Sequence, residues 1–214
     1  MKLAIEAVLL GKAAPFRGDD RSAIARTVAA GPIAVGPLGL AGDEQADLRV
    51  HGGPDKAIHH YARDHYAVWD AELHGHALLA APGAFGENLS TTGITESDLR
   101  IGDRFRLGTA LVEVSHGRQP CWKLDHRFGG AGIMKRVVQT GRSGWYYRVL
   151  EPGTVQAGDT LELVEAGTAE WTLPRVFDLL VAGHHKNDPA AVAALAGLAP
   201  LAEAWRRRAV QLAS

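Results

Sequence analysis

The run Arg104-Phe105-Arg106-Leu107-Gly108-Thr109-Ala110-Leu111-Val112-Glu113-Val114-Ser115 holds two largely apolar segments on either side of a small polar turn. Apolar residues that alternate with charged ones are typical of strands, and glycine beside a small polar residue is typical of a tight turn. The pattern therefore predicts a β-hairpin with strands over residues 104–107 and 110–115. The second strand leads directly into the segment that carries the only cysteine of the chain.

That cysteine is Cys121, in the run Arg118-Gln119-Pro120-Cys121-Trp122-Lys123-Leu124. A lone cysteine cannot form an internal disulfide. Nearby cations such as Arg118 and Lys123 favour the thiolate, which is the form that attacks substrates and binds metals. An inert, buried and reduced cysteine that packs as a small hydrophobic side chain is the alternative interpretation.

Other elements follow from the same periodicity arguments. Strands are predicted over residues 2–10, 33–35, 56–61, 145–150 and 160–164, and helices around residues 66–73 and 133–138. After Glu165 the glycine-rich strands give way to segments rich in alanine and leucine, with helices predicted over 173–182, 189–196 and 201–212. Asp188 before Pro189 is a typical helix start, and Pro200 is expected to begin the last helix in the same way. We therefore predict a main domain at 1–165 and a small three-helix domain at 166–214.

Composition limits the possible partners. The 214 residues include 23 Lys and Arg and 24 Asp and Glu, for a formal net charge of −1, so no overall basic field points to nucleic acid or to an anionic membrane. The apolar run at the N-terminus is interrupted by Glu6 and is too short and too polar for a signal peptide or a membrane span. Together with the single cysteine, this predicts a cytoplasmic protein.

Several common catalytic signatures are missing from the sequence. The histidines 51, 59, 60 and 116 lack the spacing of a zinc site, and there is only one thiol. No Gly-x-Ser-x-Gly elbow, Walker A loop or Gly-x-Gly-x-x-Gly fingerprint is present. By contrast, the cations Arg26, Lys56 and Arg118 suit a phosphate, and Gly52-Gly53 allows a ligand to approach the backbone closely.

Six separated motifs, in order, resemble the MOSC family, whose members are related to the C-terminal domain of molybdenum cofactor sulfurase. They are Gly42-Asp43, His51-Gly52-Gly53-x-x-Lys56-Ala57 with Tyr61, Gly86-Glu87-Asn88-Leu89, Ile101-Gly102-Asp103, Arg118-x-Pro120-Cys121-x-Lys123-Leu124, and Gly144-Trp145-Tyr146-x-Arg148. The last motif, followed by three helices, resembles the bacterial YiiM group more narrowly. The resemblance implies a mixed α/β fold, mainly an antiparallel, distorted β-barrel with flanking helices, plus the small three-helix domain.

The resemblance also implies a site for the molybdenum cofactor, in which a pyranopterin dithiolene holds a single molybdenum atom. Cys121 is then the protein ligand to the metal and, with His59, a catalytic residue; a soft thiolate suits this metal. The implied cofactor-binding residues are Ser22, Arg26, His51, Lys56, Tyr61, Asn88 and Arg118. By strand alternation His59 and Tyr61 share the face toward the cofactor, and His60 points away. We expect Arg26, Lys56, Asn88, Arg118 and Cys121 to converge on one pocket at the strand ends.

The function implied by this resemblance is the reduction of N-hydroxylated compounds, such as hydroxylaminopurine-type bases, at the metal. Electrons are expected from a partner flavoprotein or iron–sulfur reductase, because no flavin or nicotinamide fingerprint is visible. A homodimer is a further possibility. Two alternatives stay open at this point: a sulfur carrier or cofactor-handling protein with a persulfide on Cys121, and pyridoxal phosphate bound at Lys56.

Overall fold

The structure is a computed structural model that describes residues 1–47 and 52–213. Its centre is a nine-stranded sheet in the order β1 (Lys2–Ala4), β14 (Thr160–Glu165), β10 (Arg104–Leu107), β11 (Ala110–Gly117), β12 (Trp145–Glu151), β8 (Ile58–Ala62), β9 (Leu89–Thr91), β2 (Ala7–Leu10) and β5 (Thr27–Val28). Every neighbouring pair is antiparallel except β8 and β9. Two smaller sheets join β13 (Gly153–Val155), β6 (Ile33–Gly36) and β7 (Gly39–Leu40), and β3 (Ala14–Arg17) with β4 (Asp20–Ser22).

The predicted hairpin is present as β10 and β11, with Leu107 opposite Ala110. Phe105, Leu107, Val112 and Val114 are all buried, so the apolar positions of the pattern point into the core. The turn needs Gly108, because its φ is +55° and a Cβ there would lie 2.3 Å from the carbonyl oxygen of Thr154. The hairpin prediction is therefore confirmed.

The single strand predicted over residues 2–10 is instead two strands, and the break determines the shape of the sheet. β1 pairs with β14 at one end of the sheet, whereas β2 lies between β9 and β5 at the other end. At the break, the Ile5 amide donates to the carbonyl of Asp159 (2.9 Å) and the Glu6 amide to that of Ser90 (3.0 Å). One short segment thus contacts both ends of the sheet, which must curl so that the ends come together.

The mixed α/β class is confirmed, but the pairing pattern differs from the expected barrel. Within the described residues the strand order runs from β1 to β5 and does not close into a continuous ladder. The structure is therefore an open sheet whose ends converge on the Lys2–Leu10 segment.

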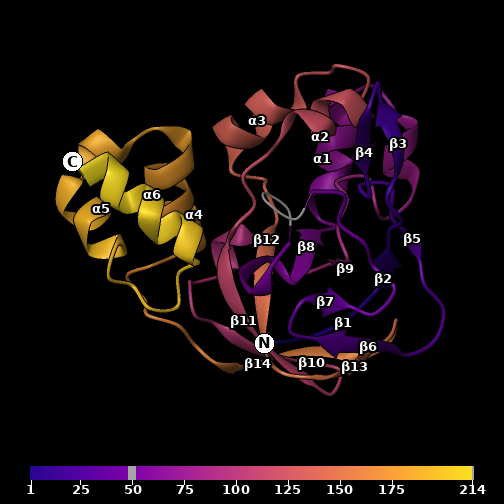
Figure 1. Cartoon of the computed structure of the whole chain (residues 1–214), viewed down its shortest axis with the longest axis horizontal. Helices are drawn as coiled ribbons and strands as arrows, with labels where there is room; N and C mark the ends of the chain where they lie inside the picture. Colours follow the sequence, from indigo (N-terminus) through magenta and orange to yellow (C-terminus); the bar gives the residue numbers. More distant parts are fainter. Residues whose placement is uncertain (48–51, 214) are drawn as a thin grey trace.

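Helices cover the sheet in two groups (Figure 1). The helices α1 (His65–Glu72), α2 (Trp122–Arg127) and α3 (Ile133–Thr140) lie together beyond one end of the central strands, near the β3–β4 hairpin. The C-terminal helices α4 (Leu173–Phe177), α5 (Pro189–Leu195) and α6 (Glu203–Ala213) form a separate group beside β11 and β12. Among the described residues, no helix has the length and apolar character needed to cross a lipid bilayer.

Two details of the C-terminal helices differ from the prediction. The segment predicted as one helix over 173–182 is α-helical only to Phe177 and then π-helical over Asp178–Ala182. The last helix begins at Glu203 and not at Pro200, because the Asp55 carboxylate accepts the Glu203 amide proton (2.9 Å) and so caps the helix there. The predicted cap at Asp188 is confirmed by its bond from the Ala191 amide (3.0 Å).

Direct contacts attach the C-terminal helices to the sheet. The Ala202 amide donates to the Ser115 carbonyl (3.1 Å), and the Leu173 amide donates to the Leu99 carbonyl (2.8 Å). The ring of buried Trp205 lies against His116, with centroids 5.2 Å apart. The predicted division at residue 165 stays a prediction, but the two parts share packed surface.

Arg148 on β12 is the main polar link between these parts. Its guanidinium binds Asp55 (2.6 and 3.0 Å), Glu113 (2.8 Å) and the carbonyl oxygen of Pro200 (2.8 Å). The side chain of Glu113 is only 6% exposed. Arg104 Nε pairs with the other carboxylate oxygen of Glu113 (2.9 Å), so Arg148 is one of two cations that neutralise this buried charge.

We therefore expect Arg148→Met to lower the free energy of unfolding by about 1.5–3 kcal/mol, because it removes charge-assisted hydrogen bonds while Glu113 keeps its pair with Arg104. The measurement is urea-induced unfolding followed by circular dichroism. The matched control is Arg106→Met, whose ion pair with Glu151 is exposed and should contribute less than about 1 kcal/mol. Equal losses for the two variants would contradict the linking role of Arg148.

Candidate functional site

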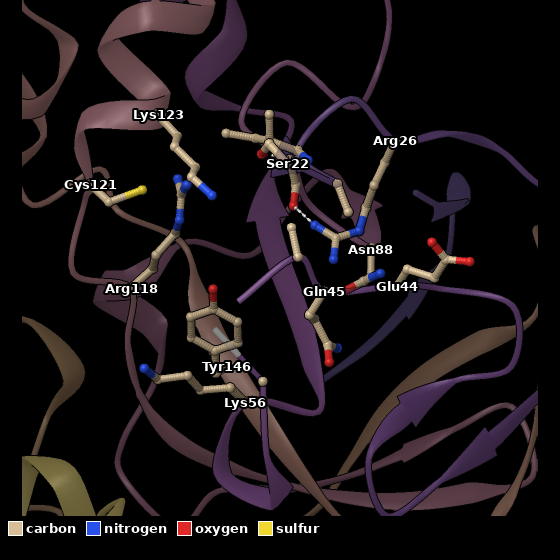
Figure 2. A pocket seen from close by; sticks show the side chains of 15 residues that line it. Ser22, Arg26, Glu44, Gln45, Lys56, Asn88, Arg118, Cys121, Lys123 and Tyr146 are labelled. Atoms are coloured by element: carbon tan, nitrogen blue, oxygen red, sulfur yellow. Dashed lines mark hydrogen bonds between the residues drawn. The ribbon is translucent and has the colours of Figure 1, made fainter. Parts of the chain in front are cut away.

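A pocket with about 580 Å³ of empty space, partly open to solvent, lies among the loops around β8, β11 and α2. Six residues singled out from the sequence line it: Ser22, Arg26, Lys56, Asn88, Arg118 and Cys121. They come from segments as far apart as β4 and α2, and Figure 2 shows them around one space. The structure therefore brings together the cations, the amide and the thiol of the predicted site.

Cys121 is half-buried and immediately precedes α2. Its backbone is extended, with φ −127° and ψ 163°, and its carbonyl accepts the Leu124 amide proton (2.9 Å). In Figure 2 the thiol points into the space that also contains the ends of Arg118 and Lys123. The thiol is thus presented to the pocket and is not sealed in the core.

Arg118 follows the end of β11 and is only 8% exposed. Its amide donates to the Gly144 carbonyl (2.9 Å), which fixes the backbone. Within residues 1–47 and 52–213, no carboxylate forms an ion pair with its guanidinium. A nearly buried guanidinium without a carboxylate partner is suited to binding an anionic ligand.

Arg26 lines the pocket, but its charge is already paired. The guanidinium makes two bonds to Asp43, from Nε to Oδ1 (3.0 Å) and from Nη2 to Oδ2 (2.7 Å), and a third to the carbonyl of Gly86. The side chain of Asp43 is 2% exposed, so this pair belongs to the interior. Arg26 therefore lines the pocket with its charge already neutralised by Asp43, and its contact with a phosphate stays a prediction.

The side chain of Asn88 is likewise already hydrogen-bonded within the protein. Its Nδ2 donates to the carbonyl of Leu9 (3.1 Å) and to Asp43 (3.0 Å), and its Oδ1 accepts the His59 amide proton (3.1 Å). Both amide protons are thus used within the protein. A bound ligand could use only the remaining lone pair of Oδ1.

Two lysines complete the basic lining. Burial lowers the pKa of Lys56, and the nearby acidic groups Asp55 and Cys121 partly oppose that shift. Lys123 is anchored by donation from Nζ to the carbonyl of Arg21 (2.7 Å). These lysines and Arg118 leave the pocket with an excess of positive charge over its acidic lining residue, Glu44.

Two of the predicted site residues do not line the pocket, and a third cannot be placed. Tyr61 is fully buried; its hydroxyl donates to the Arg142 carbonyl (3.2 Å) and accepts from Trp69 Nε1 (2.6 Å), and its ring stacks on Phe85 with centroids 4.0 Å apart. The resemblance implied that Tyr61 faces the cofactor, but its side chain lies in the aromatic core. His51 lies outside the described residues.

His59 shares its strand face with Tyr61, as expected, but lies behind the pocket wall. Its Nδ1 is 3.1 Å from the carbonyl of Gly86, and its ring packs against Tyr146 with centroids 5.0 Å apart. Burial, with smaller effects from Arg118 and Arg26, lowers its pKa well below the ordinary value. His59 is therefore not among the lining residues and packs behind Tyr146, and its catalytic role stays a prediction.

A metal site made by protein groups alone is not found among the described residues, because no group of three or more His, Cys, Asp or Glu side chains is placed to hold an ion. The pocket offers one soft donor, the thiol of Cys121. A metal bound there would need its remaining ligands from a cofactor that carries its own donors. A cofactor with sulfur ligands and an anionic phosphate fits one thiol beside a buried, unpaired guanidinium.

Comparison with known proteins identifies the family of this chain. The sequence profile described as the MOSC domain matches residues 47–162. The chain belongs to the MOSC domain family. Protein YiiM of Escherichia coli strain K12 is 44% identical over 176 residues, which cover 78% of this chain and 79% of that protein.

Other relatives extend the comparison. A protein of Gibberella moniliformis named Reductase is 41% identical over 160 residues, which cover 74% of this chain but only 28% of that longer protein. The crystal structure of YiiM from Geobacillus stearothermophilus superposes with a TM-score of 0.83 at 32% identity and covers 99% of this chain and 100% of that one. YiiM from Escherichia coli gives a TM-score of 0.81 at 34% identity, with 100% and 92% covered.

Tyr146 is a pocket residue of this MOSC protein that sequence reasoning did not select. It lies on β12, it lines the pocket, and Figure 2 shows its hydroxyl pointing into the space below Arg118. The available signal was its place in the Gly144-Trp145-Tyr146 motif, where Trp145 is buried and alternation turns Tyr146 to the opposite face. Glu44 and Gln45 also line the pocket, but they lie outside the six motifs quoted from the sequence.

Three buried histidines should make the stability of this protein depend on pH. Burial lowers the pKa of His59, and lowers those of His60 and His116 to about 3. Below about pH 6.5 the unfolded chain takes up protons that the folded chain does not, so stability is lost as the pH falls. The expected loss between about pH 7.5 and about pH 5.5 is roughly 1.4 kcal/mol for each histidine.

Urea-induced unfolding at the two pH values measures this loss, and imidazole NMR identifies the groups. Any of the three rings becoming protonated near pH 6 in the folded protein would contradict the assignment. An unfolding free energy that is equal at both pH values would do the same.

Proposed function

We propose that this MOSC protein binds the molybdenum cofactor and reduces N-hydroxylated compounds. The observation that carries the proposal is the placement of one soft thiol, Cys121, in the same pocket as the nearly buried guanidinium of Arg118, which pairs with no carboxylate of the described residues. A relative named Reductase and the family link to molybdenum cofactor sulfurase support the redox assignment.

The pocket residues have distinct binding roles in this proposal. Cys121 is the protein ligand to the metal, because a thiolate complements a soft metal with sulfur ligands. Arg118, Lys56 and Lys123 bind the anionic parts of the cofactor through charge-assisted hydrogen bonds. When bound, the cofactor supplies a metal that can accept oxygen from a substrate and exchange electrons with a donor.

The reaction converts an N-hydroxylated amine, two electrons and two protons into the amine and water. The protein must therefore hold proton-bearing groups at the pocket. Lys56 carries protons there, and its lowered pKa makes proton release easier than for an exposed lysine. The hydroxyl of Tyr146, which points into the same space, is placed to hydrogen-bond the substrate.

The electrons come from a separate protein in this proposal. In the longer Gibberella moniliformis protein the matched region covers only 28% of the chain, so most of that polypeptide has no counterpart in the match. A partner flavoprotein or iron–sulfur reductase would supply the electrons to this chain. A cytoplasmic location and a homodimer stay part of the proposal.

Cys121→Ser is expected to abolish molybdenum retention and reductase activity while the fold is kept. Removing a group that hydrogen-bonds a metal ligand lowers metal affinity or activity about 10–100-fold. Removing the ligand itself should therefore lower them more than about 100-fold. The measurements are metal analysis and reduction of hydroxylaminopurine, with the protein made in a host that synthesises the cofactor. Trp122→Phe is the neighbouring control, because Trp122 does not line the pocket.

Full activity with bound molybdenum in the serine variant would remove Cys121 from the mechanism. Sulfane sulfur on Cys121 without metal would instead favour the sulfur-carrier alternative. A pyridoxal absorption band that depends on Lys56 would favour pyridoxal phosphate binding.

Arg118→Gln is expected to weaken cofactor retention about tenfold or more, because one charge-assisted hydrogen bond contributes about 1.5–3 kcal/mol. Retention is measured as molybdenum content after dialysis. Arg106→Gln is the control, since Arg106 is partly exposed and pairs with Glu151. Equal molybdenum content in the two variants would show that Arg118 does not bind the cofactor.

A further inference from the structure

A second crevice adjoins the pocket and is formed jointly by the sheet domain and the C-terminal helices. It contains about 530 Å³ of empty space and is partly open to solvent. One wall is the 3₁₀ turn Pro54–Lys56, and the other is the start of α6, including Ala204 and Arg207. Gly52 and Lys56 line both the crevice and the pocket, so the two spaces are neighbours.

His116 on β11 lines this crevice and has an unusual environment. It is 1% exposed, and neither ring nitrogen has a hydrogen-bond partner among the residues that the structure describes. Its ring lies between Tyr146 and Trp205, with centroids 5.1 and 5.2 Å away. A buried polar atom without a partner is costly, so two on one ring indicate a group that gains its partners from a ligand.

The two spaces differ in charge. The pocket carries an excess of cations, whereas the crevice balances Lys56 and Arg207 against Asp55 and Glu203. Asp55 is already bound to Arg148 and to the Glu203 amide. An anionic ligand therefore favours the pocket, and a neutral polar ligand favours the crevice.

The imidazole of His116 is itself neutral, because burial lowers its pKa to about 3. A neutral imidazole has one hydrogen-bond donor and one acceptor. Tyr146 and Trp205 pack against the ring and hold it beside the crevice. A ring nitrogen at the crevice can therefore bind one donor or one acceptor of a neutral polar ligand, and aminopurines and related aminoheterocycles carry both kinds of group.

We propose that the crevice binds the neutral aminoheterocyclic ring of the substrate through His116, between Tyr146 and the first turn of α6. The assignment rests on the proposed reductase function for the identity of the substrate. The C-terminal helices then select the substrate, and the cationic pocket holds the cofactor. The shared Lys56 lies at the junction, where the reacting N-hydroxy group would meet the pocket.

Two variants test the crevice in the full-length, cofactor-loaded protein. His116→Phe removes both ring nitrogens, and Ala204→Trp fills the space from α6. Both are expected to raise the KM for hydroxylaminopurine about tenfold or more, with kcat and molybdenum content unchanged. The matched control is Ala193→Trp, an exposed alanine on α5 away from the crevice, which should leave KM unchanged.

A binding experiment separates this proposal from the reductase proposal. Adenine is the probe, and its binding to the full chain is followed by calorimetry and by the imidazole nitrogen NMR signals of His116. Adenine that shifts both signals in the wild type, and that fails to bind to Ala204→Trp, supports the crevice even if no reductase activity is found. An active enzyme whose KM is unchanged in both variants, or adenine that leaves His116 unperturbed, overturns it.

Discussion

The break between β1 and β2 is the constraint on which the rest of the structure depends. Because Ile5 and Glu6 bond to opposite ends of the sheet, the sheet must curl around its own first segment. The same segment then continues as β2, where the amide of Leu9 bonds to the carbonyl of Asn88 (2.7 Å) and the carbonyl of Leu9 accepts from the Asn88 side chain. The end of the segment therefore fixes one wall of the pocket.

A chain of buried polar groups extends from that wall. The Gly11 amide bonds to Asp43 (2.7 Å), and Asp43 in turn holds both Arg26 and the side chain of Asn88. These groups satisfy one another, so they cost little as a set but would be costly if any one were removed. The residues left with unused binding capacity are on the opposite wall, where Arg118 and Cys121 meet. A wall whose charges are paired therefore faces one that carries the thiol and an excess of positive charge.

The C-terminal helices contribute to the same arrangement. Arg148 and Asp55 connect the sheet, the 3₁₀ turn and the start of α6, so the position of Lys56 next to Asp55 depends on the docked helices. His116 lies at this junction, between a pocket residue and a residue of α6. The three-helix segment is thus built into the surroundings of the site and is not a separate appendage.

Local pattern alone determined much of this protein. The hairpin at 104–115, the helix around Trp69 and the cap at Asp188 all follow from short-range chemistry, because turn residues and periodicity act over a few positions. The cations, amide and thiol of the pocket could be named because the sequence resembles the MOSC family. Tertiary structure decided which partners those groups have. Arg26 pairs with Asp43, and His59 lies behind Tyr146. Tyr61 hydrogen-bonds Trp69 and stacks on Phe85. Tertiary structure also decided that residues 2–10 form two strands and that His116 meets α6, because these contacts join positions far apart in the chain, where no local pattern carries information.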